Sequence, residues 1–449
     1  MPNTHADAAP RKYESTPSTS PRGLWHRMRV WLGRAGPMPK LAMAFGFLTL
    51  LLIGCLHLTE TGPWQPAPAK PILTPPSVDR LVRVRLSTEG KREADILSVT
   101  TCFRITDAVT GSVLVDRHTA VRRAAVRCSH AAGGIDFRGE HLPGSDVLLT
   151  PEYDASIILN GKTYRGELRI QRRENQLIFV NQVDIESYLC GVLRGELHRY
   201  FHREAFMTQA IAARTYVLYN MQRTPSNRIW DVLNNESSQM YIGVSGEDRI
   251  AVDAVKETGG QVCVWDDGGV DRLFCTYYSS TCGGVTQRVS QFRPNEPGVP
   301  PLCGNVLCRD CYLAPHYRWG PVSVSRAEVT KRVLARYPSL RRLGTIEAIK
   351  PKDRGADGRI THVELVGADG SIGTLVAEDF RLAVGGRTIK STCFDLEIDG
   401  DDFVFKNGKG YGHGVGLCQH GMEAKARRGW NHERILATYY PGAKIKTAY

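Results

Sequence analysis

The 449-residue sequence contains no repeat of fixed period and no compact run of Lys and Arg interleaved with aromatic residues. Because the repeat is missing, a collagen-like chain is excluded, and 42% hydrophobic with 23% charged residues excludes global disorder. Because the basic run is missing, the net charge of +12 gives little support to nucleic-acid binding, and residues 1–40 alone contribute +5 of it. We therefore expect a globular chain with no nucleic-acid partner.

Charged residues are also missing from 41–58, where eighteen consecutive positions hold no Asp, Glu, Lys or Arg. A run of this length approaches the thickness of the hydrocarbon core of a bilayer. The basic 1–40 tail precedes it and Glu60 follows it, so the positive-inside rule predicts a cytoplasmic tail and an extracytoplasmic remainder. The run is either a transmembrane signal anchor or a lipoprotein signal with lipid on Cys55, because Leu52 to Cys55 resembles a lipobox. Both interpretations anchor the main domain to the cytoplasmic membrane, in the cell envelope.

The composition then divides the rest of the chain. Residues 59–77 are rich in proline, which favours extended polyproline II and predicts a semi-rigid linker. Residues 78–183 alternate apolar and polar positions, as in 81–86 and 176–180, and Asn160-Gly161 is a typical hairpin turn. We predict a β-rich N-terminal part there, followed by a second region over 184–449.

The pattern changes to a helical period after position 183. Apolar residues recur with the spacing of one helix face at Ile185, Tyr188, Leu189, Val192 and Leu193. Asp184 is a suitable N-cap, Gly195 follows the last of these positions, and a second helix is predicted over about 203–221. Strand-like alternation returns at 359–366, so the predicted fold class is α+β.

Twelve cysteines are present, and eleven of them lie beyond Cys55. If these residues are extracytoplasmic, disulfides would persist, but an odd number leaves at least one thiol free or several on a metal. The densest group is Cys282, Cys303, Cys308 and Cys311, and the last two have the C-x-x-C spacing that suits tetrahedral zinc. Zinc and disulfides both remain open for this group.

Two charged residues on the predicted helices are candidates for chemistry, Glu196 and Arg214. Glu196 follows Gly195 at the predicted end of the first helix, where a carboxylate is usually a solvated surface group. Arg214 lies among apolar residues in the middle of the second helix, a setting in which a guanidinium needs a carboxylate partner or an anionic ligand. Structural ion pairing is the simpler interpretation of Arg214.

Four blocks of sequence resemble the SpoIID/LytB family of peptidoglycan-active proteins, in the order that the family shows. They are VNQVDIESYLCGVLRGELHRYFHREAFMTQAIAARTYVLYNMQ, WDVLNNESSQMYIGV, AVKETGGQV with YYSSTCGGVTQ, and GYGHGVGLCQHGMEAKARRGWNHERILATYYPGAKI. The resemblance covers about 78–449 and implies that 184–449 is a SpoIID-like catalytic domain with a cysteine-rich loop and a C-terminal GHG motif.

The resemblance also implies an activity. The sporulation member of the family is a lytic transglycosylase, in which the glutamate at the position of Glu196 is the catalytic acid. Such an enzyme needs only one carboxyl group, which protonates the glycosidic oxygen and then acts as a base while the 6-hydroxyl of the sugar closes a 1,6-anhydro ring. No cofactor is required, and the expected substrate is the MurNAc–GlcNAc strand of peptidoglycan. Amidase enhancers belong to the same family, so the alternative is a non-enzymatic glycan-binding protein that assists a cell-wall amidase.

Further site residues follow from the resemblance. The candidate substrate-binding residues are Gln209, Arg214, Gln239, Tyr241, His413 and Gln419. Arg214 is expected to organise the site without touching Glu196, because a nearby cation would lower the pKa of the acid. His413 and Gln419 lie among glycines that let a ligand approach the backbone, and a glycine-rich turn packed on the core is the alternative. The glycine run lacks the Lys-Ser/Thr ending of a phosphate-binding loop, and the zinc ligands that some family members have near Leu233 and Ser238 are missing.

Overall fold

The computed structural model describes residues 80–87, 95–128, 133–153, 155–296 and 298–449, which fall in one compact unit, Lys70–Tyr449. The predicted tail, the apolar segment 41–58 and the whole proline-rich linker 59–77 lie outside the described residues. Within the described residues, no helix is both long and apolar enough to cross a membrane.

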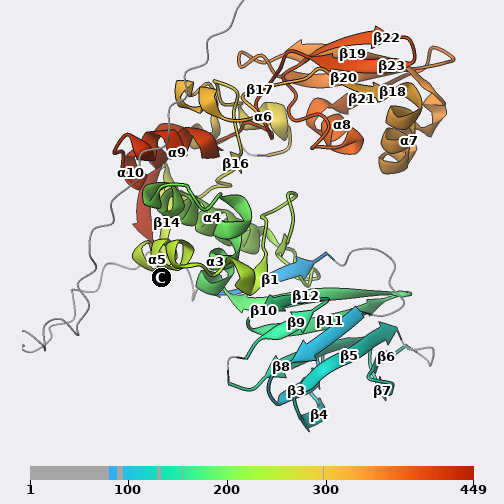
Figure 1. Cartoon of the computed structure of the whole chain (residues 1–449), viewed down its shortest axis with the longest axis vertical. Coiled ribbons are helices and arrows are strands. Elements are labelled where there is room, and N and C mark those ends of the chain that lie inside the picture. The colour runs from blue at the N-terminus through green and yellow to red at the C-terminus, as the bar shows by residue number, and fades with distance from the viewer. Residues whose placement is uncertain (1–79, 88–94, 129–132, 154, 297) are drawn as a thin grey trace, which may run out of the picture. The chain divides into compact units, whose positions relative to one another are not determined.

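Strands dominate the described residues before position 185 and form two sheets (Figure 1). The larger sheet has the order β13 (Val232–Leu233), β1 (Leu81–Leu86), β12 (Gln176–Asp184), β11 (Glu167–Arg173), β8 (Asp146–Pro151), β3 (Phe103–Asp107) and β4 (Val113–His118). The other has the order β10 (Lys162–Tyr164), β9 (Ile157–Leu159), β2 (Asp95–Val99), β5 (Val121–Cys128), β6 (Ile135–Phe137) and β7 (Glu140–Leu142). The predicted strands over 81–86 and 176–180 are confirmed.

Alternation explains β1, because Val82, Val84 and Leu86 point into the core while the residues between them are more exposed. The Asn160-Gly161 turn between β9 and β10 is also confirmed, with φ of 51° and 83°, the left-handed values that a tight hairpin turn requires. β1 pairs antiparallel with β12 and parallel with β13, so residues near 232 lie beside β1, the neighbour of the strand β12 that leads into the first helix.

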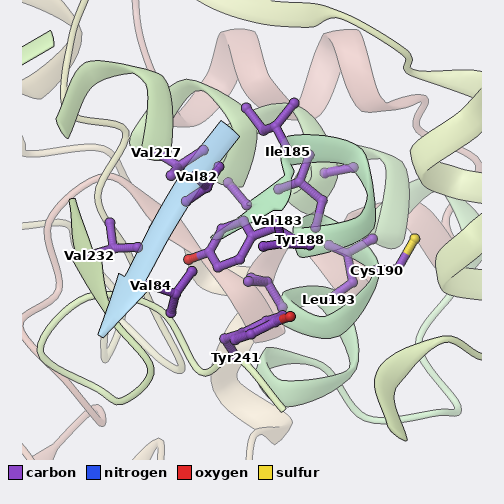
Figure 2. Packing of buried hydrophobic residues seen from close by; sticks show 14 of the residues in the cluster. Val82, Val84, Val183, Ile185, Tyr188, Cys190, Leu193, Val217, Val232 and Tyr241 are labelled. Atoms are coloured by element: carbon purple, nitrogen blue, oxygen red, sulfur yellow. The ribbon is translucent and has the colours of Figure 1, made fainter. Parts of the chain in front are cut away.

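The two predicted helices follow the sheets. α3 spans Ile185–Glu196, and Asp184 caps it by accepting hydrogen bonds from the backbone N–H groups of Glu186 and Ser187. Its apolar face is buried as predicted, and Figure 2 shows Tyr188 of this helix beside Tyr241 and the valines of β1. α4 spans Arg203–Arg223 and is buried around most of its circumference.

The remaining elements of the main core frame the C-terminal blocks. They are η1 (Gly243–Gly246), α5 (Arg249–Glu257), β14 (Gln261–Asp267), β15 (Val270–Leu273), β16 (Tyr278–Ser279), α6 (Val289–Phe292), η2 (Pro300–Leu302), η3 (Arg309–Leu313), β25 (Leu417–Cys418), α9 (Gln419–Arg427), α10 (His432–Tyr439) and β26 (Lys444–Thr447). β16 pairs parallel with β25, Tyr278 opposite Leu417, so segments about 140 positions apart in the sequence are adjacent here.

A second hydrophobic core forms between Trp319 and Phe405. Its elements are β17 (Arg318–Trp319), β18 (Val322–Ser325), α7 (Arg326–Arg336), η4 (Pro338–Leu343), β19 (Ile346–Arg354), β20 (Ile360–Gly367), β21 (Ile372–Val376), α8 (Ala377–Val384), β22 (Asp395–Asp399), β23 (Asp402–Lys406) and β24 (Gly408–Lys409). The strand predicted at 359–366 is β20, the middle strand of three. Helices and strands together confirm the α+β class.

Candidate functional site

Glu196 is the last residue of α3, and the segment after β13 closes over it. The backbone N–H of Met240 donates a hydrogen bond to Glu196 Oε1 at 2.8 Å. Gly195 permits this approach, because a Cβ atom there would lie 1.8 Å from the carbonyl oxygen of Met240. The glycine before the carboxylate is therefore a packing requirement of the site.

Two side chains from distant segments complete the surroundings of the carboxyl group. The hydroxyl of Tyr278 in β16 donates to Glu196 Oε1 at 3.3 Å. Gln419, at the start of α9, donates from Nε2 to Glu196 Oε2 at 3.4 Å. Oε1 thus accepts two hydrogen bonds and Oε2 accepts one long one.

The carboxyl group of Glu196 is half-buried and has no charged partner. Burial raises its pKa above the ordinary value, and the donors Met240, Gln419 and Tyr278 offset only part of that rise. No Lys, Arg or His side chain in the described part of the chain pairs with it. The negative end of the α3 dipole also favours the protonated form. This environment favours the protonated form of the carboxylic acid.

Gln239 fixes the direction of the hydrogen bond from Tyr278. The hydroxyl of Tyr188 donates to Gln239 Oε1 at 2.9 Å, which sets the orientation of the amide. Gln239 Nε2 then donates to the Tyr278 hydroxyl oxygen at 3.0 Å, so that the Tyr278 proton is directed to Glu196. Gln239 is a positioning residue in this geometry.

Arg214 belongs to α4, and its side chain reaches Glu186 in the first turn of α3, at the end opposite Glu196. Its guanidinium forms a double hydrogen bond with Glu186, from Nε to Oε1 at 2.9 Å and from Nη2 to Oε2 at 2.6 Å. The remaining donors reach the carbonyl oxygens of Gln261 and Val255, and the side chain is 0% exposed. These bonds agree with the prediction that Arg214 does not contact Glu196. The ion pair with Glu186 explains why an arginine can be buried here.

Four predicted substrate contacts need correction. Gln209, Arg214 and Gln239 are 0% exposed and Tyr241 is 3% exposed, so none of them can touch a ligand that arrives from solvent. Tyr241 donates instead to Asn181 Oδ1 at 2.9 Å, and its ring packs against Gly191 of α3, where a Cβ atom would collide with it. These residues build the core behind the site.

The GHG loop packs against protein atoms on both sides. His413 stacks on Phe292 with ring centroids 4.6 Å apart and accepts a hydrogen bond at Nδ1 from the Val415 N–H. Burial lowers the pKa of His413 to about 4, so the ring is neutral at pH 7. A Cβ atom on Gly414 would lie 2.5 Å from the guanidinium of Arg359, which donates to the Gly412 carbonyl. Close packing accounts for these glycines, while the contact of His413 with a glycan remains a prediction.

The cysteine group also differs from the expectation. Cys282, Cys308 and Cys311 do come together, but their fourth neighbour is Cys418 of β25, and Cys303 is exposed on the surface. The inclusion of Cys303 was wrong because proximity in sequence favoured it, whereas the pairing of β16 with β25 brings Cys418 in from far away.

Three features near Glu196 were not predicted. The Met240 N–H and the Tyr278 hydroxyl are set by tertiary structure and leave no local signal. His198 and Tyr200 lie two and four positions after the acid in the sequence and stack with ring centroids 5.2 Å apart, and Tyr200 is 62% exposed. Exposed aromatic faces suit the apolar face of a sugar ring, and the run LHRYFH directly after Glu196 was the available signal.

The fold and the site thus describe an α+β protein with a half-buried carboxyl group that lies at a helix end and has only neutral hydrogen-bond partners. The model of the SpoIID family, stage II sporulation protein, matches residues 173–265, which include α3, α4 and Glu196. A domain of unknown function, DUF8618, matches residues 310–416, which include the second hydrophobic core.

Similarity to curated proteins extends further along the chain. An uncharacterized protein of Brachyspira hyodysenteriae is 30% identical over 293 residues, 64% of this chain and 73% of that protein. Stage II sporulation protein D of Bacillus subtilis is 24% identical over 295 residues, 62% of this chain and 78% of the relative. The amidase enhancer of Bacillus subtilis is 26% identical over 367 residues, 71% of this chain and 49% of the relative. The chain belongs to the SpoIID/LytB family.

Proposed function

We propose that this protein is a peptidoglycan lytic transglycosylase that cleaves MurNAc–GlcNAc strands and leaves 1,6-anhydro ends, with Glu196 as its single catalytic carboxyl group. The observation that carries the proposal is the environment of Glu196. Its carboxyl group lies at a helix C-terminus, accepts three neutral hydrogen bonds, has no cation beside it and has a raised pKa. A general acid needs these conditions to hold a proton near neutral pH.

The proposed reaction uses the two oxygens differently. Oε1 already accepts from Met240 and Tyr278, so the transferable proton resides on Oε2. That proton moves to the glycosidic oxygen as the bond between C1 of MurNAc and this oxygen breaks. The resulting carboxylate then accepts the proton of the MurNAc 6-hydroxyl while O6 bonds to C1. The anhydro ring closes, Glu196 regains its proton, and neither water nor a cofactor is consumed.

The surroundings of Glu196 support both halves of this cycle. Burial favours the protonated acid at the start, and the Met240 N–H, the Tyr278 hydroxyl and Gln419 Nε2 stabilise the transient carboxylate. Gln419 is 6% exposed, and we propose that its amide lies at the edge of the glycan site together with His413. The exposed face of Tyr200 would support a sugar ring beside the acid.

The test is a Glu196→Gln variant, which keeps the shape and removes the proton. The full chain in detergent would be incubated with intact and with peptide-stripped glycan strands, and anhydro ends would be counted by mass spectrometry. We expect the variant to stay folded and to bind strands, with its rate reduced by at least about a hundredfold. Glu236→Gln is the matched control, because Glu236 is exposed and the charge change is identical. Undiminished cleavage by Glu196→Gln would assign the chemistry to another carboxylate.

The second candidate function rests on the similarity to the amidase enhancer of Bacillus subtilis. In this function the same site binds glycan without cleaving it, and a cell-wall amidase is the partner. If the wild-type chain produces no anhydro ends from either substrate, yet binds strands and stimulates an added amidase, this function replaces the first.

We also propose that segment 41–58 anchors the chain to the cytoplasmic membrane, that 59–77 acts as a linker, and that 78–183 and 184–449 act on the wall from outside. The support is the apolar run with its basic leading flank. Alkaline phosphatase fused after Ser77 should be active, and the enzyme fused after Pro39 should be inactive. The reverse result would refute an extracytoplasmic location.

A further inference from the structure

We propose that Cys282, Cys308, Cys311 and Cys418 bind one zinc ion as a tetrahedral four-thiolate site. Each of the four offers its Sγ atom, and these atoms all lie within 4.8 Å of one another. The residues come from three segments: the loop after β16, the start of η3, and the end of β25. The chain therefore converges on this point from positions that are far apart in sequence.

The spacing of the sulfur atoms matches a zinc site. The Sγ atoms of Cys282 and Cys311 are 3.7 Å apart. A zinc ion bound by four thiolates at about 2.3 Å in a tetrahedron holds neighbouring sulfurs about 3.8 Å apart. Bonded disulfide sulfurs are about 2.05 Å apart, and two disulfides give no reason for all four sulfurs to approach one another. The four-way convergence therefore favours a metal.

The protein around the cluster supplies what thiolates need. All four cysteines are buried, with exposures between 0% and 4%. The N–H of Cys282 donates to Cys418 Sγ at 3.3 Å, and the N–H of Gly284 donates to Cys282 Sγ at 3.4 Å. The hydroxyl of Tyr439 lies 3.0 Å from Cys308 Sγ. Hydrogen bonds of this kind around metal ligands stabilise the charged sulfur and fix its orientation.

Gly421 provides an independent sign that space is kept for the sulfurs. A Cβ atom at this position would lie 2.1 Å from the Tyr439 hydroxyl oxygen, 2.4 Å from Cys308 Sγ and 3.2 Å from Cys418 Sγ. The residue lies in the first turns of α9 at an ordinary helical position, so its conformation does not demand glycine. Glycine costs helix stability here, and the close approach of the two cysteines, together with the Tyr439 hydroxyl that contacts Cys308, explains it.

The site has a consequence for Glu196, and this consequence rests on the proposed function. Cys418 directly precedes Gln419, whose amide donates to Glu196 Oε2. A metal bound by Cys418, Cys282 and the cysteines of the η3 segment would hold Gln419 in place without taking part in the reaction. Lys425 of α9 and Asp310 of η3 form an ion pair at 2.5 Å that braces the same two elements. Gln419 would thus be positioned by the cluster.

The first test measures metal in the full chain, purified in detergent without chelators. We expect about one zinc per chain by elemental analysis, with four sulfur ligands at about 2.3 Å by X-ray absorption. Cys418→Ser should reduce the bound zinc by at least tenfold, and Cys303→Ser, the matched control at an exposed cysteine, should leave it unchanged. If Cys418→Ser does not fold, cobalt exchanged into the wild-type chain still reports the site through intense thiolate-to-metal absorption bands.

Three results would overturn the proposal. They are a wild-type chain without metal, peptide mapping that finds these four cysteines in disulfides, and loss of zinc from Cys303→Ser equal to that from Cys418→Ser. None of these measurements involves glycan, so the zinc site and the transglycosylase can fail separately. If both hold, metal removal with a chelator should lower the anhydro-product rate, and added zinc should restore it.

Discussion

The two ends of α3 each carry a glutamate at the edge of the core, and the protein treats the two carboxyl groups in opposite ways. Glu186, in the first turn, receives a double hydrogen bond from the buried guanidinium of Arg214, and the Tyr449 hydroxyl donates to it as well. Glu196, in the last turn, receives only neutral donors. One helix therefore holds a paired carboxylate and an unpaired one ten positions apart.

The pKa values diverge for identifiable reasons. Burial alone would raise the pKa of Glu186, but the hydrogen bonds and charge of Arg214, with Tyr449 and Gly260, bring it below the ordinary value. The helix dipole acts in the same direction at this end and in the opposite direction at Glu196. For Glu196 burial dominates, and the pKa is raised. When neighbours push the pKa values of two carboxyl groups apart in this way, the group with the lower pKa suits a structural anion and the group with the higher pKa suits a proton donor.

The largest expected effect comes from breaking the paired end. Arg214→Met leaves Glu186 without its cation, and removal of one partner of a buried pair costs about 3–5 kcal/mol. We expect a loss of that size in the free energy of unfolding at pH 7, measured by denaturant titration. The lowered pKa of Glu186 means that the stability from this pair is present above pH 4.5 and is lost as pH falls through its folded pKa. The deficit of the variant should therefore shrink in acid.

Arg223→Met is the control for this change. Arg223 lies on α4, the helix that also carries Arg214. It is exposed and contacts the ring of Tyr219. Its replacement should change the free energy of unfolding by less than about 0.5 kcal/mol. Equal losses in the two variants, or a deficit of Arg214→Met that does not shrink at all as the pH falls below 4.5, would refute the structural role of the Glu186–Arg214 pair.

Local features of the fold could be predicted because their causes are local. The period of α3, the cap at Asp184 and the alternation of β1 all depend on residues within one or two turns of each other. The identity of Glu196 as a candidate came from the family resemblance, because a glutamate after a glycine is unremarkable by itself. The spacing of residues within one segment was therefore sufficient to predict helices and strands, but it was insufficient to predict the site.

Features that depend on chain crossings could not be predicted. Met240, Tyr278 and Gln419 approach Glu196 only because distant segments cross, with β16 beside β25. Because of the same crossing, the sulfur cluster contains Cys418, whereas the sequence predicted Cys303. Motif matching also assigned Gln239 to ligand binding. A match shows that a residue is part of the family pattern, but it cannot distinguish a buried positioning residue from a residue that contacts the ligand.

The smallest expected effect concerns the unpaired end. Wild-type production of anhydro ends should fall as pH rises through the raised pKa of Glu196, because only the protonated form donates. Tyr278→Phe removes a donor that favours the carboxylate, so the pKa should rise further and the falling limb should move to higher pH. Loss of one neutral hydrogen bond is worth about 0.5–1.5 kcal/mol, so rates should change by no more than about tenfold.

The pH profile distinguishes this role of Tyr278 from simple packing. Tyr219→Phe is the control, because its hydroxyl donates to Glu296 at 2.7 Å and not to Glu196. It should leave the falling limb in place even if it lowers stability slightly. If Tyr278→Phe loses rate at every pH without moving the limb, the hydroxyl shapes the site but does not tune the acid. If the limb moves to lower pH, the assignment of Glu196 as a proton donor tuned by neutral hydrogen bonds is wrong, because loss of a donor to a carboxylate can only favour its protonated form.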